Sequence, residues 1–238
     1  MKIFNRIREN FHLRLKDRQS AGNILGETLK DLIKKENRKN CIVLGIPRGG
    51  VITGCHIAEK LGCKFGILIS RKISAPHNKE LAIGAITGDG IVYLNDMLVK
   101  KLDISSDYIV KEKLQQIEEI RRRISIYCPN KKTLTGYDTT ELNDKIVILA
   151  DDGTATGATL IAAKRSIESF GNIRQLIVAS PVAPKGTIVL LKNEGIDYFE
   201  ILITPSDSQF KSVEQYYEDF HQLSDEEVIR SIPYIDDS

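Results

Sequence analysis

Two adjacent carboxylates stand near the middle of the chain, at the start of a loop of small residues. Asp151 and Asp152 follow an apolar run at residues 147–150, and residues 153–159 are all glycine, alanine or threonine. Apolar residues three or four apart then continue to Gly171, which predicts an amphipathic helix that ends there. This pattern places the acids at the carboxyl end of a buried strand and the small-residue loop at the amino terminus of a helix.

A loop of this kind is suited to binding phosphate. Backbone N–H groups in the first turn of a helix have no intrahelical partner, and they carry the positive end of the helix dipole. Small side chains let a phosphate approach these groups, and threonine hydroxyls add hydrogen bonds. Carboxylates beside an anion site indicate that the same ligand also offers hydroxyl groups or brings Mg²⁺.

A second loop of similar design follows an apolar strand predicted at residues 41–45, and a helix is predicted after it at residues 51–61. The loop combines turn-forming residues with one cation: Pro47, Arg48, Gly49 and Gly50. The glycines allow close approach of the backbone, and the guanidinium of Arg48 matches phosphate oxygens. Turns are rich in proline and glycine, so this loop alone is weak evidence. Together, the two loops predict a ligand with phosphate at both ends.

The stretch from residue 147 to residue 159 resembles, at every position, the 5-phosphoribosyl-1-pyrophosphate (PRPP) signature of type I phosphoribosyltransferases. In that family the two acids hold the ribose 2′- and 3′-hydroxyls, so the resemblance implies that Asp151 and Asp152 orient the ribose and its hydrated Mg²⁺. It also implies that the loop holds the 5′-phosphate through Gly153, Thr154, Ala155, Thr156, Gly157, Ala158 and Thr159. A generic strand-turn-helix with a chance Asp-Asp pair is the competing interpretation, but an ordinary turn needs no such run of residues.

The resemblance implies that the Pro47–Arg48–Gly49–Gly50 loop binds the pyrophosphate of PRPP. Arg48, with Arg71 or Lys72, would stabilise the departing pyrophosphate. Arg71 and Lys72 follow a strand predicted at residues 64–69, on the side of an open α/β sheet where ligands bind. Solvated charge at a sheet edge is the alternative for this pair. One arginine of the run at residues 121–123 could also reach the pyrophosphate, although the adjacent acids favour a solvated, salt-bridged helix face over a nucleic-acid site.

Recognition of the acceptor base is expected after a strand predicted at residues 176–180, from Val182, Ala183 and Lys185, with Tyr217 as an aromatic candidate. Hypoxanthine-guanine enzymes of the family carry a third acid in the signature, where this chain has Ala155. The resemblance therefore implies poor use of 6-oxopurines.

A hairpin predicted at residues 82–94 corresponds to the family's mobile loop. His77 and Glu80 beside it are candidates for a role over the reacting centre, although a lone histidine in a polar loop is more commonly just solvated.

Alternating strands and helices predict an α/β fold, a Rossmann-like open parallel sheet of about five strands with helices on both faces, plus a small hood or flexible hairpin element. The length of 238 residues suits a single domain. Its expected core is 40–204, with a hairpin and helical insertion at 73–130 and terminal arms at 1–18 and 205–238. Asp17–Arg18 resembles a feature of one bacterial and archaeal branch of the family; a helix N-cap with a surface charge pair is an equal alternative.

Composition narrows the class of protein further. The formal net charge is +2, so the chain as a whole shows no footprint for nucleic acid, and no apolar run approaches the length of a membrane span. Four cysteines without C-x-x-C spacing predict buried thiols in a reducing cytoplasm.

The resemblance implies a Mg²⁺-dependent enzyme that transfers the phosphoribosyl group of PRPP to a small nitrogenous base and releases pyrophosphate. We expect PRPP and that base as partners, in a homodimer that binds neither nucleic acid nor membrane. A regulator that binds PRPP without turnover is the main alternative. A phosphohydrolase or nucleoside phosphorylase explains less of the signature.

Overall fold

The computed structural model describes residues 6–7, 14–128, 142–196 and 198–232. Its larger sheet has the strand order β1-β9-β8-β7-β2-β3, and every neighbouring pair is parallel. The strands are β1 (Arg6–Ile7), β2 (Cys41–Gly45), β3 (Lys64–Ile67), β7 (Ile146–Ala150), β8 (Gln175–Val182) and β9 (Tyr198–Ile203). The prediction of about five parallel strands is confirmed, and the two-residue β1 adds a short edge strand.

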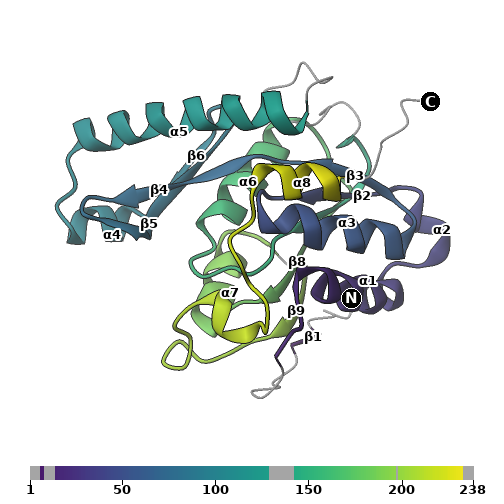
Figure 1. Cartoon of the computed structure of the whole chain (residues 1–238). Helices are drawn as coiled ribbons and strands as arrows, with labels where there is room; N and C mark the ends of the chain where they lie inside the picture. Colours follow the sequence, from purple (N-terminus) through teal and green to yellow (C-terminus); the bar gives the residue numbers. More distant parts are fainter. Residues whose placement is uncertain (1–5, 8–13, 129–141, 197, 233–238) are drawn as a thin grey trace.

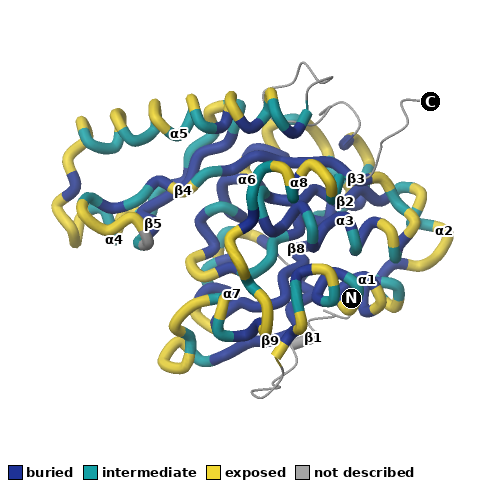
Figure 2. The backbone as a smooth tube through the Cα atoms, viewed as in Figure 1, coloured by how far each residue is buried: buried dark blue, intermediate teal, exposed yellow. Residues whose placement is uncertain are grey.

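Helices cover both faces of this sheet (Figure 1). The covering helices are α1 (Arg18–Leu32), α3 (Gly49–Leu61), α6 (Ala158–Ser169) and α7 (Lys185–Asn193), and the body also contains the short helices α2 (Lys35–Arg38) and α8 (Asp225–Ser231). Successive residues of a strand point to opposite faces, so each central strand feeds two cores. On β7, Ile148 joins the core that includes α1 and α3, whereas Val147 and Leu149 join the core that includes α6 and α7. The central strands are accordingly buried along their length (Figure 2).

A second, antiparallel sheet forms an arm that projects from this body (Figure 1). It contains β4 (Ser70–Ala75), β5 (Asn78–Thr87) and β6 (Val92–Leu94), and it is followed by α4 (Asp96–Lys101) and the long α5 (Ser106–Tyr127). The predicted hairpin is present as β5 and β6, but β4 was not predicted. None of the described helices is long and apolar enough to cross a membrane.

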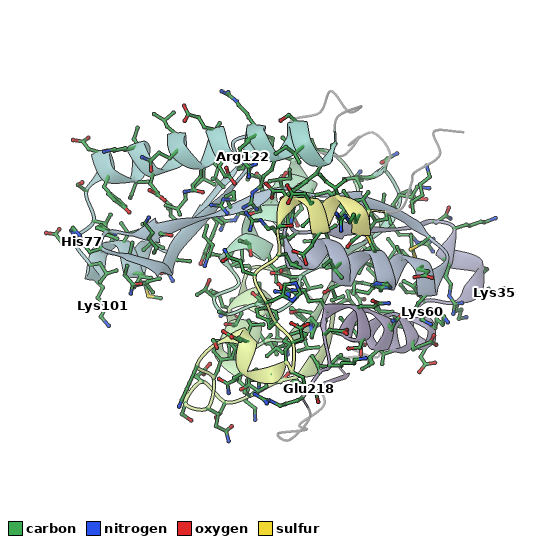
Figure 3. The ribbon with its side chains drawn as sticks, viewed as in Figure 1. Lys35, Lys60, His77, Lys101, Arg122 and Glu218 are labelled. Atoms are coloured by element: carbon green, nitrogen blue, oxygen red, sulfur yellow. The ribbon has the colours of Figure 1, made fainter. Side chains whose placement is uncertain are left out.

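One sequence prediction about the arm needs correction. Arg71 and Lys72 do not follow the strand predicted at residues 64–69, because β3 ends at Ile67 and both residues lie inside β4. Antiparallel pairing of β4 with β5 decides their placement. His77 is exposed in the turn between these strands, at the far tip of the arm (Figure 3). The side chain of Glu80 lies outside the described residues.

The chain after β9 returns to the carboxyl ends of the parallel strands. It forms a 3₁₀ turn, η2 (Val213–Tyr216), and then α8, which lies beside α3 and the end of α5 (Figure 1). Ser224 caps α8 in a capping box with Glu227. We call residues 213–225 the C-terminal segment. The boundaries of the expected single domain stay a prediction.

Candidate active site

The two loops singled out in the sequence lie in contact at the carboxyl ends of the neighbouring strands β2 and β7. A Cβ atom on Gly50 would lie 2.5 Å from the carbonyl oxygen of Ala150 and 2.9 Å from the Cα atom of Asp151. A Cβ atom on Gly49 would lie 1.8 Å from Oδ2 of Asp152. Close approach of the loops therefore requires glycine at both positions. The peptide bond between Pro47 and Arg48 is cis.

The small-residue loop enters α6 through Gly157, whose φ of 73° favours glycine. Thr154 is buried and fixes the loop: its N–H donates to the carbonyl oxygen of Val182, and its Oγ1 accepts the N–H of Gly157. Ala155 and Thr156 are exposed. The first N–H groups of α6 have no partner within the helix. An exposed turn of this kind has the properties that an anion-binding loop needs.

The two adjacent acids have different environments. Oδ2 of Asp152 accepts a hydrogen bond from Nε of Arg18 at 2.7 Å, whereas Oδ1 of Asp151 accepts the N–H of Asp152 at 3.0 Å. Burial, followed by the negative charge of Asp152, raises the pKa of Asp151 well above its usual range, and the positive charge of Lys72 opposes this shift. Hydroxyl donors or a cation at this point would favour the ionised pair.

The donor set fits Mg²⁺ held jointly with a ligand. Mg²⁺ sites of that type use one or two carboxylates, with substrate oxygens and water completing the shell. Asp151 and Asp152 provide such carboxylates. Among the described residues no group of three or more His, Cys, Asp or Glu side chains could hold a metal. A magnesium ion here would therefore depend on oxygens of the ligand.

Arg48 precedes α3 and is held by the C-terminal segment. Its Nη1 donates to the carbonyl oxygen of Leu223 at 2.6 Å, and its Nε lies 3.3 Å from Oδ1 of Asp225. This Nε is buried and makes no hydrogen bond to any described residue. Asp225 thus balances the charge of this guanidinium without accepting a hydrogen bond from Nε, so an anionic ligand that supplies such an acceptor would be stabilised here.

Further arginines gather where β4, α5 and α8 meet. Arg71 donates from Nε to Gln116 on α5, and burial followed by the charge of Arg123 lowers its pKa. Arg123 is buried and donates to Glu119. Arg122, labelled in Figure 3, donates from Nη1 to Asp225 of α8 at 2.8 Å. The salt bridges predicted for this helix face are present, because Arg122 and Arg123 both pair with Glu119, but the face is not solvated throughout, because Arg123 is buried.

The residues predicted to recognise the base are not gathered at an open surface. Strand β8 extends to Val182, and the side chains of Val182 and Ala183 are fully buried, so they cannot contact a base in this conformation. The prediction that this strand ends at Ser180 is corrected, because β8 continues through Val182. Lys185 is exposed at the start of α7. Tyr217 is 2% exposed and donates its hydroxyl hydrogen to the carbonyl oxygen of Asp152, which buttresses the backbone of the acidic pair.

Two further residues belong to this site. Arg18 was left open between a site feature and a surface charge, and the structure places it against Asp152. Asp225 was not a predicted site residue, yet its carboxylate accepts from Arg122 and Tyr127 and lies beside Arg48. The Asp17–Arg18 pair was the only sequence signal for Arg18, and no local signal marks Asp225 as a site residue.

Comparison with known proteins gives consistent matches. The model of the phosphoribosyl transferase domain matches residues 13–218. The Mycobacterium tuberculosis (strain H37Rv) protein Rv0571c, whose curated name provisionally assigns it to the phosphoribosyl transferases, is 33% identical over 213 residues, or 90% of this chain. This chain spans 45% of that relative's length. The crystal structure of TT1426 from Thermus thermophilus is 31% identical with a TM-score of 0.68, and the match covers 92% of this chain and 97% of that one.

Proposed function

This chain belongs to the phosphoribosyl transferase domain family, and we propose that it transfers the 5-phosphoribosyl group of PRPP to a nitrogenous base with release of pyrophosphate. The observation that carries the proposal is the direct contact between the acidic, small-residue loop and the arginine-glycine loop. Both ends of one bisphosphorylated ligand would then be held within a single site.

The proposed reaction breaks the bond between ribose C1 and the pyrophosphate oxygen and forms a bond from C1 to a nitrogen of the base. No protein nucleophile is needed, so the residues act by positioning and by electrostatics. Residues 153–159 would hold the 5′-phosphate, and Asp151 and Asp152 would orient the ribose hydroxyls. Arg48, with Arg71 or Lys72, would stabilise the charge that develops on pyrophosphate. Bound Mg²⁺, held through the two acids, would neutralise part of the leaving-group charge.

The acceptor is proposed to be a small nitrogenous base other than a 6-oxopurine. Ala155 is exposed in the signature loop and cannot exchange a proton with a purine ring nitrogen. Lys185, exposed after β8, is the remaining candidate of the three predicted base contacts. The free cysteines Cys41, Cys55 and Cys63 support our proposal of a reducing, cytoplasmic setting.

Titration calorimetry with PRPP and MgCl₂ tests the proposal. The wild-type protein should bind PRPP in a Mg²⁺-dependent manner, and the double variant Asp151→Asn/Asp152→Asn should lose that binding. Asp107→Asn is a matched control, because Asp107 is exposed in the first turn of α5 on the arm and is distant in the sequence from the acidic pair. Unchanged affinity in the double variant would overturn the assignment.

A second assay then separates an enzyme from a regulator. Pyrophosphate release from PRPP is measured across a panel of nucleobases and other nitrogen heterocycles. Release with at least one base supports the transferase. Tight PRPP binding that depends on Asp151 and Asp152, with no pyrophosphate release for any base, would instead support a regulator that binds PRPP.

A further inference from the structure

We infer that Arg18 is a positioning residue of this site, which holds the Asp152 carboxylate in the orientation that receives a ribose hydroxyl. The inference rests on the proposed function, because it assigns Arg18 a role in binding the ribose of PRPP. It adds to the site a residue that lies 134 positions away from its partner in the sequence.

The guanidinium of Arg18 is held on three sides. Its Nε donates to Oδ2 of Asp152 at 2.7 Å, and its Nη1 donates to the carbonyl oxygen of His221 at 3.0 Å. Its Cζ atom lies 3.8 Å from the centroid of the Phe220 ring, within the range of a cation–π contact. The side chains of Arg18 and Asp152 are 9% and 16% exposed. These contacts hold the guanidinium in one position, and the carboxylate that is hydrogen-bonded to it is fixed as well.

Asp152 is fixed from its other sides as well. Oδ2 occupies the space next to Gly49 where a Cβ atom would stand, and Tyr217 binds the backbone carbonyl oxygen of Asp152 at 2.7 Å. With Oδ2 bound to Arg18, the second oxygen of the carboxylate is the one that can turn to a ligand. The pair thus selects a single presentation of Asp152 toward the ribose.

A purely structural role explains this pair less well. The start of α1 is already stabilised by the capping box of Asp17 and Ser20, and buried Leu25 and Leu29 hold α1 in the core it shares with α3. A buried ion pair contributes little net stability compared with apolar residues of similar size, whereas it restricts the orientation of both partners. Restricted orientation is useful where a carboxylate must meet a hydroxyl group within a few tenths of an ångström.

The test measures binding of two partial ligands by calorimetry in the whole chain, ribose 5-phosphate and magnesium pyrophosphate. Arg18→Gln should weaken ribose 5-phosphate at least tenfold and change magnesium pyrophosphate by less than twofold. Arg18→Lys keeps the charge but cannot reproduce both guanidinium bonds, so it should recover part of the loss. Lys30→Gln is the control on the same helix, because Lys30 pairs with Glu27 on the exposed surface of α1.

A double-variant comparison makes the coupling specific. In the Asp152→Ala background, Arg18→Gln should have little further effect on ribose 5-phosphate, since alanine offers no acceptor to Arg18 and the interaction under test is already removed. If Arg18→Gln fails to fold, as judged by thermal melting, Arg18→Lys carries the same comparison against Lys30→Gln.

The outcomes are distinct. If the wild-type protein binds neither PRPP nor ribose 5-phosphate, the proposed function is overturned, and this inference with it. If the Arg18 variants bind ribose 5-phosphate with the same affinity as the wild-type protein, the inference alone is overturned. Equal weakening of ribose 5-phosphate and pyrophosphate would show a general structural or pyrophosphate-binding role, which also contradicts it.

Discussion

Replacing Arg48 by alanine should weaken ligands that contain pyrophosphate far more than it weakens ribose 5-phosphate. In the structure, Nη1 of Arg48 donates to the carbonyl oxygen of Leu223, whereas its buried Nε is ion-paired with Asp225 at 3.3 Å but makes no hydrogen bond among the described residues. A pyrophosphate oxygen in this loop would supply a hydrogen-bond acceptor for Nε in competition with Asp225. The loop that would hold the 5′-phosphate is a different one, so ribose 5-phosphate should not depend on this guanidinium.

The size of the effect follows from the bond that is lost. A hydrogen bond to a charged group contributes about 1.5–3 kcal/mol, which corresponds to a loss of about 10- to 150-fold in affinity. We expect this loss for PRPP and for magnesium pyrophosphate, and a change below about twofold for ribose 5-phosphate. Arg48→Lys should fall between wild type and Arg48→Ala, because an ammonium group keeps the charge without the planar fork.

Calorimetric titration with the three ligands measures these differences directly. Arg174→Ala serves as the control, because Arg174 is exposed at the opposite end of β8 from the site. Equal weakening of ribose 5-phosphate and pyrophosphate by Arg48→Ala would place Arg48 outside a dedicated pyrophosphate loop and refute the reasoning.

Four other predictions follow from single positions. Gly49→Ala should reduce ribose 5-phosphate affinity at least tenfold in calorimetry, because the new Cβ would lie 1.8 Å from Oδ2 of Asp152 and displace that carboxylate. Asp225→Asn should strengthen magnesium pyrophosphate binding by up to about fivefold, because Asp225 competes with the ligand for Arg48 and a partly exposed ion pair contributes a free energy of that size. Weaker binding in this variant would contradict the prediction. Hypoxanthine and guanine should turn over about 10²- to 10⁴-fold more slowly than an accepted base in steady-state assays, because Ala155 supplies no general acid. Hydrogen bonds from Arg122 and Arg123 lower the pKa of Glu119 from 4.5 to about 2 in the folded protein. The ionised carboxylate therefore stabilises the fold above pH 4.5, and this stability is lost as the pH falls from 4.5 toward about 2. Glu119→Gln should therefore flatten that acidic part of the melting-temperature profile.

The chemistry-bearing loops were open to prediction because their signals are local. An apolar run that ends in Asp151 and Asp152, followed by small residues and an amphipathic pattern, determines a strand, a turn and a helix within about 25 consecutive residues. The same is true of β2, the loop at Arg48 and α3. Parallel strands present their carboxyl ends on one edge of a sheet, so the meeting of the two loops could be expected as well.

The arm and the base contacts could not be predicted in the same way. Whether residues 70–75 continue a parallel strand or start an antiparallel one depends on a partner, β5, that lies later in the chain. The apolar residues Val182 and Ala183 suit a loop or the end of a strand equally well, and only the pairing of β8 with β9 places them in the core.

The sequence by itself thus determined the two anion loops, the acidic pair and the parallel α/β order, since periodicity, turn chemistry and helix capping act between near neighbours. Only the tertiary structure decided which charges the site contains besides these. Arg18 opens α1 and Asp225 opens α8, and both look like ordinary helix starts until packing brings Arg18 to Asp152 and Asp225 to Arg48. Their roles depend on distances between elements far apart in the chain, which no pattern among near neighbours specifies.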